Sequence, residues 1–236
     1  MGAYAGRTAL VTGSRRGVGK LIADHFLEQG ASVVGFAKGT STIEHAAYHH
    51  VQVDLADAVA IGPAFASLRQ NATTIDIVVN NAAVLTSQYA MIMPPGAAQA
   101  MVNVNLLAPF LVSREAAKMM RKTKWGRIIN IGSMAASLEP IGDSMYAATK
   151  AGLSTLTNVM AKEFGSMNVT CNTLAITAID TDMLSQVPRD KVEAIIAGLP
   201  IPRFAKPDDI LNIIDFFASE RSSYITAQTI FMGGVN

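Results

Sequence analysis

The sequence has a single cysteine among its 236 residues, and its basic and acidic side chains nearly balance. One cysteine excludes a disulfide framework and any metal site built from several cysteines. Nineteen Lys and Arg against eighteen Asp and Glu give a formal net charge of +1, which argues against a nucleic-acid-binding surface. Only 16% of the residues are charged and 50% are hydrophobic, so the sequence can form a large core and disorder is not expected.

Long apolar runs and metal-ligand clusters are also scarce in the sequence. No uninterrupted apolar stretch approaches the ~18–20 residues that span a bilayer. The N-terminal segment lacks a secretory core, and Gly6 stands where a myristoylation signal has Ser or Thr. His45 and His49 have helical spacing but no third ligand nearby, so no metal site is predicted. We expect a cytoplasmic protein without nucleic-acid or membrane partners.

Short β-branched segments alternate with segments of helical periodicity. Strands are expected at 8–12, 33–36, 51–53, 75–80, 127–131, 169–174 and 229–232, and helices at 17–29, 57–70, 97–122, 144–165, 189–198 and 207–219. Strands that are apolar on both faces and separated by helices predict a parallel sheet covered on both sides. Right-handed crossovers then give a doubly wound α/β (Rossmann) fold of about seven strands. A single domain over 1–236 is expected, with a substrate cover around 182–206.

A glycine-rich segment, Thr12-Gly-Ser-Arg-Arg-Gly-Val-Gly19, follows the first predicted strand and opens the first predicted helix. Glycine allows a sharp turn there and a close approach of the helix N-terminus to a pyrophosphate, whose charge is favoured by free N–H groups. The residues expected to bind a dinucleotide here are Gly13, Ser14, Arg15, Arg16, Gly17, Val18 and Gly19. A P-loop is the rival reading, and it fails because Leu21 stands where Ser or Thr must hold magnesium.

The end of the second predicted strand indicates which dinucleotide binds. NAD sites usually carry an acid there, and this strand ends in Gly35-Phe-Ala-Lys38 without a carboxylate. Lys38 and Arg16 could flank a 2′-phosphate through charge-assisted bonds, which favours NADP(H). Two solvated surface cations are the alternative. Asp54 and Leu55 are placed to meet the adenine, although an acid at a strand end also serves as a turn former.

Four side chains indicate carbonyl chemistry. Tyr146 and Lys150 are four residues apart on a predicted helix and share one face. A neighbouring cation lowers the pKa of a tyrosine, which can then exchange a proton with a carbonyl or alcohol near neutrality. Ser133 ends a predicted strand, where ligands sit in open α/β sheets. Pro109 removes the helical partner of the Asn105 carbonyl, so a kink could leave an acceptor for water.

Taken together, these motifs resemble those of the short-chain dehydrogenase/reductase superfamily. The matching segments are Thr12–Gly19, Asn80–Ala83, Asn105, Ser133 and Tyr146–Lys150. The similarity is greatest to the branch of 3-oxoacyl-(acyl-carrier-protein) reductases, as shown by Gly126–Ser133, Tyr146–Gly152 and Tyr224–Gln228. The resemblance covers nearly the whole chain.

The resemblance implies hydride transfer between nicotinamide C4 and a carbonyl carbon. Tyr146 would be the acid in reduction, and Ser133 would bond the substrate oxygen. Lys150 would hold the nicotinamide ribose and lower the pKa of Tyr146, and Asn105 would bind a relay water. The further cofactor contacts that the resemblance implies are Asn80, Ala82, Ile179 and Thr181.

The resemblance also implies a homotetramer or homodimer in which helices 97–122 and 144–165 pair across an interface. The branch's arginine for docking the acyl carrier protein is replaced by Met167, which makes that partner doubtful. Met134, Leu138, Met145, Met183 and Leu184, with Ser133 and Tyr146, are expected to line an apolar pocket, with ordinary core packing as the alternative. An apolar or acyl-like ketone then fits better than a sugar.

We therefore expect an NADPH-dependent ketone reductase. Two other readings stay open. One is a cofactor-binding sensor or scaffold without turnover, and the other is an alcohol dehydrogenase that works mainly in the oxidative direction.

Overall fold

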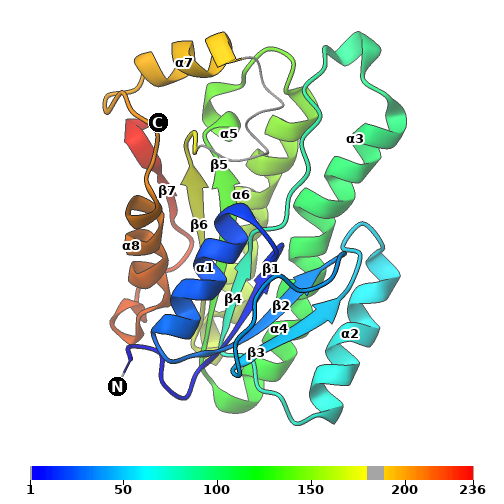
Figure 1. Ribbon diagram of the computed structural model, residues 1–236, viewed down its shortest axis with the longest axis vertical. Helices are drawn as coiled ribbons and strands as arrows, with labels where there is room; N and C mark the ends of the chain where they lie inside the picture. Colours follow the sequence, from blue (N-terminus) through cyan, green and yellow to red (C-terminus); the bar gives the residue numbers. More distant parts are fainter. Residues whose placement is uncertain (1, 180–188, 236) are drawn as a thin grey trace.

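The computed structural model describes residues 2–179 and 189–235, which form a seven-stranded parallel sheet with helices on both faces (Figure 1). The strands are β1 (Thr8–Thr12), β2 (Ser32–Ala37), β3 (Tyr48–Gln52), β4 (Ile77–Asn80), β5 (Gly126–Ser133), β6 (Val169–Ile176) and β7 (Thr229–Phe231). Their order across the sheet is β3-β2-β1-β4-β5-β6-β7. The chain reverses its direction of travel between β1 and β4, and ligands bind at such a switch point. The doubly wound fold predicted from the sequence is confirmed.

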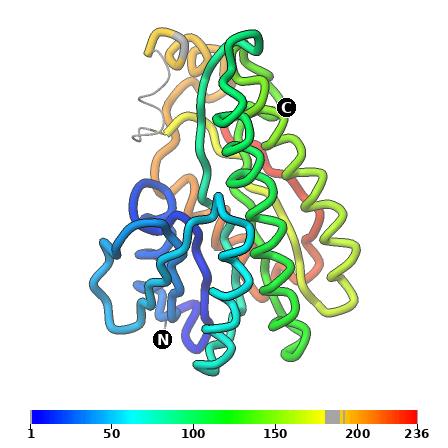
Figure 2. The backbone as a smooth tube through the Cα atoms, turned by 90° about the vertical axis from the view of Figure 1, so that its right-hand side faces the viewer, coloured from blue at the N-terminus to red at the C-terminus, as the bar shows by residue number. Residues whose placement is uncertain are grey.

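Two helical layers cover the sheet. The helices are α1 (Gly17–Glu28), α2 (Ala58–Gln70), α3 (Pro95–Val102), α4 (Ala108–Thr123), α5 (Ala135–Leu138), α6 (Ser144–Phe164), α7 (Arg189–Ala197) and α8 (Pro207–Ala218). Helices α1 and α8 pack on one face, while α2, α4 and α6 lie side by side on the other (Figure 2). Successive strand residues point to opposite faces, so Val11 packs under α1 and Leu10 faces the layer of α2 and α4.

The helix expected at 97–122 contains a π turn. Residues Asn103–Leu107 form this turn between α3 and α4, and the Ala108 N–H bonds to the Asn103 carbonyl. Pro109 therefore falls in the first turn of α4, where its missing N–H is tolerated. The kink expected at Pro109 is thus replaced by one wide helical turn. Such turns are frequent at functional sites.

By length and composition alone, Pro95–Thr123 could cross a bilayer, and 39% of its most apolar window is buried inside the structure. The core helix of a folded domain passes the same test. Here α4 packs on the sheet through Val112, Ala116 and Met120, and it carries the charged cluster around Glu115. We therefore assign it to the domain core.

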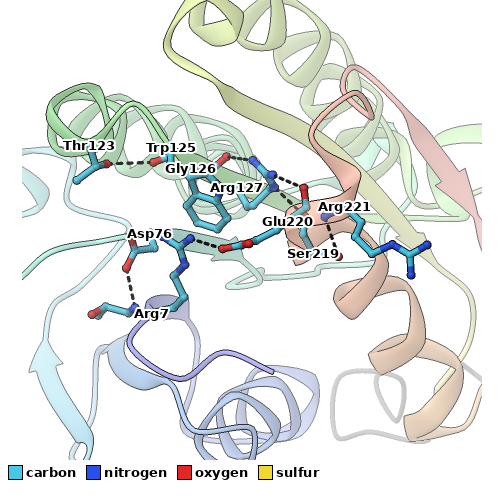
Figure 3. A network of polar contacts seen from close by, with 10 residues as sticks. Arg7, Asp76, Thr123, Trp125, Gly126, Arg127, Ser219, Glu220 and Arg221 are labelled. Atoms are coloured by element: carbon cyan, nitrogen blue, oxygen red, sulfur yellow. Dashed lines mark hydrogen bonds and ion pairs between the residues drawn. The ribbon is translucent and has the colours of Figure 1, made fainter. Parts of the chain in front are cut away.

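A cluster of cationic and aromatic side chains packs at the amino end of the sheet (Figure 3). Arg127 at the start of β5 is fully buried and donates to the carbonyls of Ser219, Glu220 and its neighbour Gly126. Its guanidinium lies 4.5 Å from the Trp125 ring centroid, and that of Arg7 lies 3.8 Å from the same centroid. This cluster ties β1 and β5 to the end of α8, at the opposite end of the sheet from the glycine-rich turn.

Candidate active site

A cavity of about 750 Å³ runs along the carboxyl ends of the strands. It begins at the glycine-rich turn after β1, passes the ends of β2 and β4, and reaches Ser133 and Tyr146 beside β5 and α6. Pockets of ~300–1,000 Å³ are typical of ligand sites. The phosphate end and the chemical end predicted from the sequence therefore lie in one continuous space.

The glycine-rich turn has the backbone conformation that its glycines predict. Gly13 has φ +69° and Gly17 has φ +54°, in the region that favours glycine. Both residues line the cavity, and Gly17 begins α1, so the positive end of that helix dipole meets the cavity. Gly19 does not line the cavity. A β-carbon at Gly19 would collide with the Gly13 carbonyl, so this glycine permits close packing of helix on strand.

Cations gather where β2 ends. The Lys38 ammonium lies 2.7 Å from the Asp54 carboxylate, and both residues line the cavity together with Arg15 and Arg16. The ion pair raises the pKa of Lys38 and lowers that of Asp54. Because the Lys38 side chain is 80% exposed, the pair adds little to stability, and its charge is accessible to a ligand. No acidic side chain occupies the end of β2 itself.

Ser133, Tyr146 and Lys150 converge at the other end of the cavity. The Ser133 hydroxyl accepts a bond of 3.1 Å from the Ala135 N–H and shares a hydrogen bond with the Tyr146 hydroxyl. The Lys150 Nζ donates to the main-chain oxygen of Ile131 at 2.7 Å and lies 5.8 Å from the Tyr146 ring centroid. All three reactive side chains are buried.

Burial controls the ionisation of this group. Burial raises the pKa of Tyr146, the nearby charge of Asp143 raises it further, and the Ser133 hydrogen bond partly opposes both. Burial also lowers the pKa of Lys150 to about 8. The net change in the pKa of Tyr146 is therefore an increase, whereas the resemblance implies a decrease through Lys150. Desolvation disfavours the charged forms of both the phenol and the amine.

Asn105 lies in the π turn and is fully buried. Its side-chain oxygen accepts from the Val84 N–H at 2.8 Å, and its amide donates to the Val84 carbonyl at 2.9 Å and to the Thr149 hydroxyl at 3.3 Å. The Thr149 hydroxyl in turn donates to the Tyr146 carbonyl. The Asn105 side chain is thus outside the cavity and fixes its wall at Val84. The relay-water role that the resemblance implies for Asn105 is a separate matter from these side-chain contacts and stays a prediction.

Two other predicted cofactor residues also have side chains outside the cavity. Ser14 is buried and bonds to the Tyr48 hydroxyl. Asn80 donates to Ser113 and to Asn130 within the core. Asn81 lines the cavity in place of Asn80 and donates to the Thr12 carbonyl. Consecutive residues at a strand end face opposite sides of the sheet, but this alternation does not say which of the two reaches the cavity.

Only some of the residues predicted to line the substrate pocket line the cavity. Met134 lines the cavity, whereas Leu138 is 43% exposed and Met145 packs in a small cluster with Met101 and Ala135. Neither side chain lines the cavity of the described structure, so substrate contact at Leu138 and Met145 stays a prediction. The remaining predicted contacts, Thr181, Met183 and Leu184, lie outside the described residues. The other predicted cofactor residues that line the cavity are Val18, Leu55, Ala82 and Ile179.

Asp143 is a cavity residue that the sequence analysis missed. It precedes α6, three residues before Tyr146, and one of its carboxylate oxygens is buried without a hydrogen-bond partner in the described structure. It makes no side-chain cap for α6. A carboxylate directly before a helix reads as a cap from sequence, which is why its place in the cavity was not predicted.

Residues 7–192 match the family described as short chain dehydrogenase. The chain belongs to this family. Its similarity to 3-oxoacyl-(acyl-carrier-protein) reductases is nearly full length. It is 33% identical to the enzyme of Pseudomonas aeruginosa over 97% of this chain and 96% of that one, and 33% identical to the enzyme of Vibrio harveyi with the same coverage.

The short chain dehydrogenase fold is also found in close structural neighbours. A gluconate 5-dehydrogenase from Burkholderia cenocepacia, solved in complex with NADP and tartrate, superposes with a TM-score of 0.91 at 28% identity, covering 98% of this chain and 94% of that one. Membership in the family makes the protein an oxidoreductase with a nicotinamide dinucleotide cofactor.

Proposed function

We propose that the protein is an NADPH-dependent reductase that converts a ketone to an alcohol. The observation that carries the proposal is the meeting of Ser133, Tyr146 and Lys150 in the cavity that starts at the glycine-rich turn. NADPH, when bound, supplies the hydride. The protein's own residues bind the carbonyl oxygen and deliver the proton.

The ionisation of the site suits reduction. Because burial raises the pKa of Tyr146, its hydroxyl is protonated at neutral pH, which is the form that a general acid needs. The Ser133 hydroxyl, next to that of Tyr146, donates to the substrate oxygen and stabilises the charge that develops on it. Lys150, held by the Ile131 carbonyl, lies where it can bond the nicotinamide ribose and support reprotonation of Tyr146.

The preference for NADP(H) rests on charge at the end of β2. Arg15, Arg16 and Lys38 line the cavity there, against the single carboxylate of Asp54. A 2′-phosphate carries negative charge and binds best to such cations. The NADP in the gluconate 5-dehydrogenase neighbour is consistent with this assignment.

An apolar, 3-oxoacyl-like ketone is the proposed substrate. Met134, Val192 and Ile195 supply apolar wall near Tyr146, and the curated relatives reduce 3-oxoacyl groups according to their names. Met167, on the short turn before β6, leaves the acyl carrier protein without the arginine expected in that branch, so we do not include that partner in the proposal.

We further propose a cytoplasmic, single-domain enzyme with a substrate cover around 182–206 that assembles as a homotetramer or homodimer. Phe110 on α4 is 36% exposed and Val159 on α6 is 46% exposed, on the two helices expected to pair. Light scattering after gel filtration should therefore give more than one chain per particle. Charged substitutions at Phe110 and Val159 together should shift the particle toward a monomer.

A Tyr146→Phe variant tests the catalytic proposal. NADPH oxidation should be followed with a panel of β-ketoesters, acyl thioesters, diketones and quinones. The variant should lose turnover by a factor of at least about 10² while still binding NADPH, because only the acid is removed. Tyr224→Phe, at a tyrosine that is 98% exposed, is the matched control. Unchanged reduction in Tyr146→Phe would contradict the proposal, and no reduction by the unmodified protein would favour a sensor or an enzyme of the oxidative direction.

A further inference from the structure

One face of the edge strand β3 reaches toward the cofactor end of the cavity. Tyr48, His50 and Gln52 alternate along β3, so their side chains share a face of the strand. The Tyr48 hydroxyl lies 2.9 Å from the Ser14 hydroxyl in the glycine-rich turn. The Gln52 amide donates to the Lys38 carbonyl at 2.9 Å. Side chains of β3 therefore contact both the glycine-rich turn after β1 and the start of the loop after β2.

These contacts form a continuous hydrogen-bonded chain. The His50 Nε2 lies 2.8 Å from the Gly39 carbonyl, and its Nδ1 lies 3.3 Å from the Tyr48 hydroxyl. A carbonyl can only accept, so Nε2 carries the proton, and in the neutral ring Nδ1 accepts from Tyr48. The Ser14 hydroxyl is then the donor to Tyr48. The chain runs from Ser14 through Tyr48 and His50 to Gly39, and it joins the glycine-rich turn to the loop after β2.

A glycine on the neighbouring strand makes room for this chain. A β-carbon at Gly35 on β2 would collide with the hydroxyls of both Tyr48 and Ser14. Glycine inside a strand weakens the strand and often marks a close approach of other groups. Glycine at position 35 therefore leaves the space that the Tyr48 hydroxyl needs to reach Ser14.

The loop held by His50 lies against two cations of the cavity, Arg15 and Lys38. The Arg15 guanidinium packs over Gly39, where a β-carbon would displace it, and its Nε donates to the Thr40 carbonyl at 2.5 Å. The Thr42 hydroxyl returns a bond of 2.6 Å to the Arg15 carbonyl. Lys38 precedes this loop and lines the cavity with Arg15. β3 thus holds the main chain at Lys38 and Gly39, directly before the Thr40 carbonyl that accepts from Arg15.

We propose that Tyr48 and His50 are positioning residues that give the protein its preference for a 2′-phosphate over a 2′-hydroxyl on the adenosine ribose. They set the distance between the glycine-rich turn and the loop after β2, and so the placement of Arg15 and Lys38. The inference rests on the proposed NADP(H) function. It concerns only the end of the cofactor that distinguishes NADPH from NADH.

Histidine variants separate this role from a general structural one. Calorimetric titration with NADPH and with NADH should show that His50→Ala weakens NADPH binding by about tenfold, the equivalent of one lost charge-assisted contact, and NADH binding by less than about twofold. His50→Gln keeps a donor near the Gly39 carbonyl and should stay close to the unmodified protein. His49→Ala is the matched control, because His49 is exposed and lies between Tyr48 and His50 on the other face of β3.

The outcomes distinguish the proposed NADP(H) function from the proposed role of His50. Unmodified protein that binds NADH at least as tightly as NADPH would overturn the proposed cofactor. A clear NADPH preference that His50→Ala leaves unchanged, or a loss of equal size for both cofactors, would overturn the role of His50 and leave the cofactor proposal standing. If His50→Ala fails to fold, Tyr48→Phe removes a single oxygen and should selectively weaken the binding of NADPH. An unchanged ratio of NADPH to NADH affinity in Tyr48→Phe would equally overturn the inference.

Discussion

The ammonium nitrogen of Lys150 lies 2.7 Å from the main-chain oxygen of Ile131, inside the protein. A carbonyl dipole at this distance does not replace the water that an ammonium group loses on burial, and the pKa of Lys150 falls to about 8. Lys150, on the same helix face as Tyr146, is therefore a costly residue for the folded state.

Replacing Lys150 with methionine should stabilise the cofactor-free protein at neutral pH. The folded-state pKa is about 8 and the ordinary value is 10.5, so the unfolded chain binds the proton more tightly. The cost is fully present below pH 8 and disappears as the pH rises toward 10.5. The cost of burying the charged amine amounts to about 3 kcal/mol. The substitution also loses the hydrogen bond to Ile131, worth about 1 kcal/mol, so the net stabilisation is smaller by that amount.

Urea unfolding of both proteins at pH 7, 8, 9 and 10 measures this difference. Lys150→Met should have the larger free energy of unfolding at pH 7, and the gap should close at the alkaline end. A gap that does not change with pH would show that Lys150 titrates normally in the folded state. Turnover should be lost in the variant at every pH, as expected where stability and activity oppose each other.

The charge of Asp143 should shift the pH range of the reduction, in addition to the larger effect of burial on Tyr146. Its negative charge raises the pKa of Tyr146, so Asp143→Asn should lower that pKa. Reduction needs the protonated tyrosine, and the alkaline decline of kcat should therefore begin at a lower pH in the variant. Glu139→Gln, at an exposed residue of the same loop, should leave the profile in place. A profile that moves to higher pH in Asp143→Asn would refute this account.

The sequence was sufficient for the order of the strands and of the main helices, because this order depends on periodicity and on glycine. It placed Gly13 and Tyr146 in one site, since parallel strands bring their carboxyl ends to the same edge of the sheet. It did not resolve which of Asn80 and Asn81 faces the cavity, although β4 ends at Asn80 as predicted, because the partners of both side chains are distant in the sequence.

Properties that depend on burial could not be predicted from spacing. The four-residue separation of Tyr146 and Lys150 correctly placed both on one face of α6, but the sign of the pKa change depends on how much water the fold excludes from them. The chain of Tyr48 and His50 was missed for a related reason. It joins β3 to two loops, and no local pattern in β3 records those partners.

Cofactor preference should respond to the charge at Lys38. Lys38→Asp places a second carboxylate beside Asp54 and should weaken NADPH by about tenfold or more through lost attraction and new repulsion. NADH, with a ribose hydroxyl to donate, should bind better than before. Lys38→Asn removes the cation without adding a charge and should show only the NADPH loss. Equal NADPH-to-NADH affinity ratios in the unmodified protein and in Lys38→Asp would move the phosphate contact to other residues.

Stability and activity should separate at Arg127. Its guanidinium donates to the carbonyls of Gly126, Ser219 and Glu220, and Arg127→Met would leave the buried Gly126 carbonyl and the part-buried carbonyls of Ser219 and Glu220 without this donor. A buried unpaired carbonyl costs about 1–3 kcal/mol, part-buried ones cost less because water can reach them, and the relief of a buried charge offsets part of this, so a net loss of about 1–3 kcal/mol is expected.

The loss at Arg127 should appear in thermal or urea unfolding and leave the KM for NADPH unchanged, because Arg127 lies at the amino end of β5 and the cavity lies at the carboxyl ends of the strands. Arg221→Met is the matched control, since the Arg221 side chain is exposed beside the same cluster (Figure 3). A variant that keeps full stability would mean that water replaces the guanidinium among these carbonyls. A changed KM at unchanged stability would mean that the two ends of the sheet are coupled, against the separation argued from the fold.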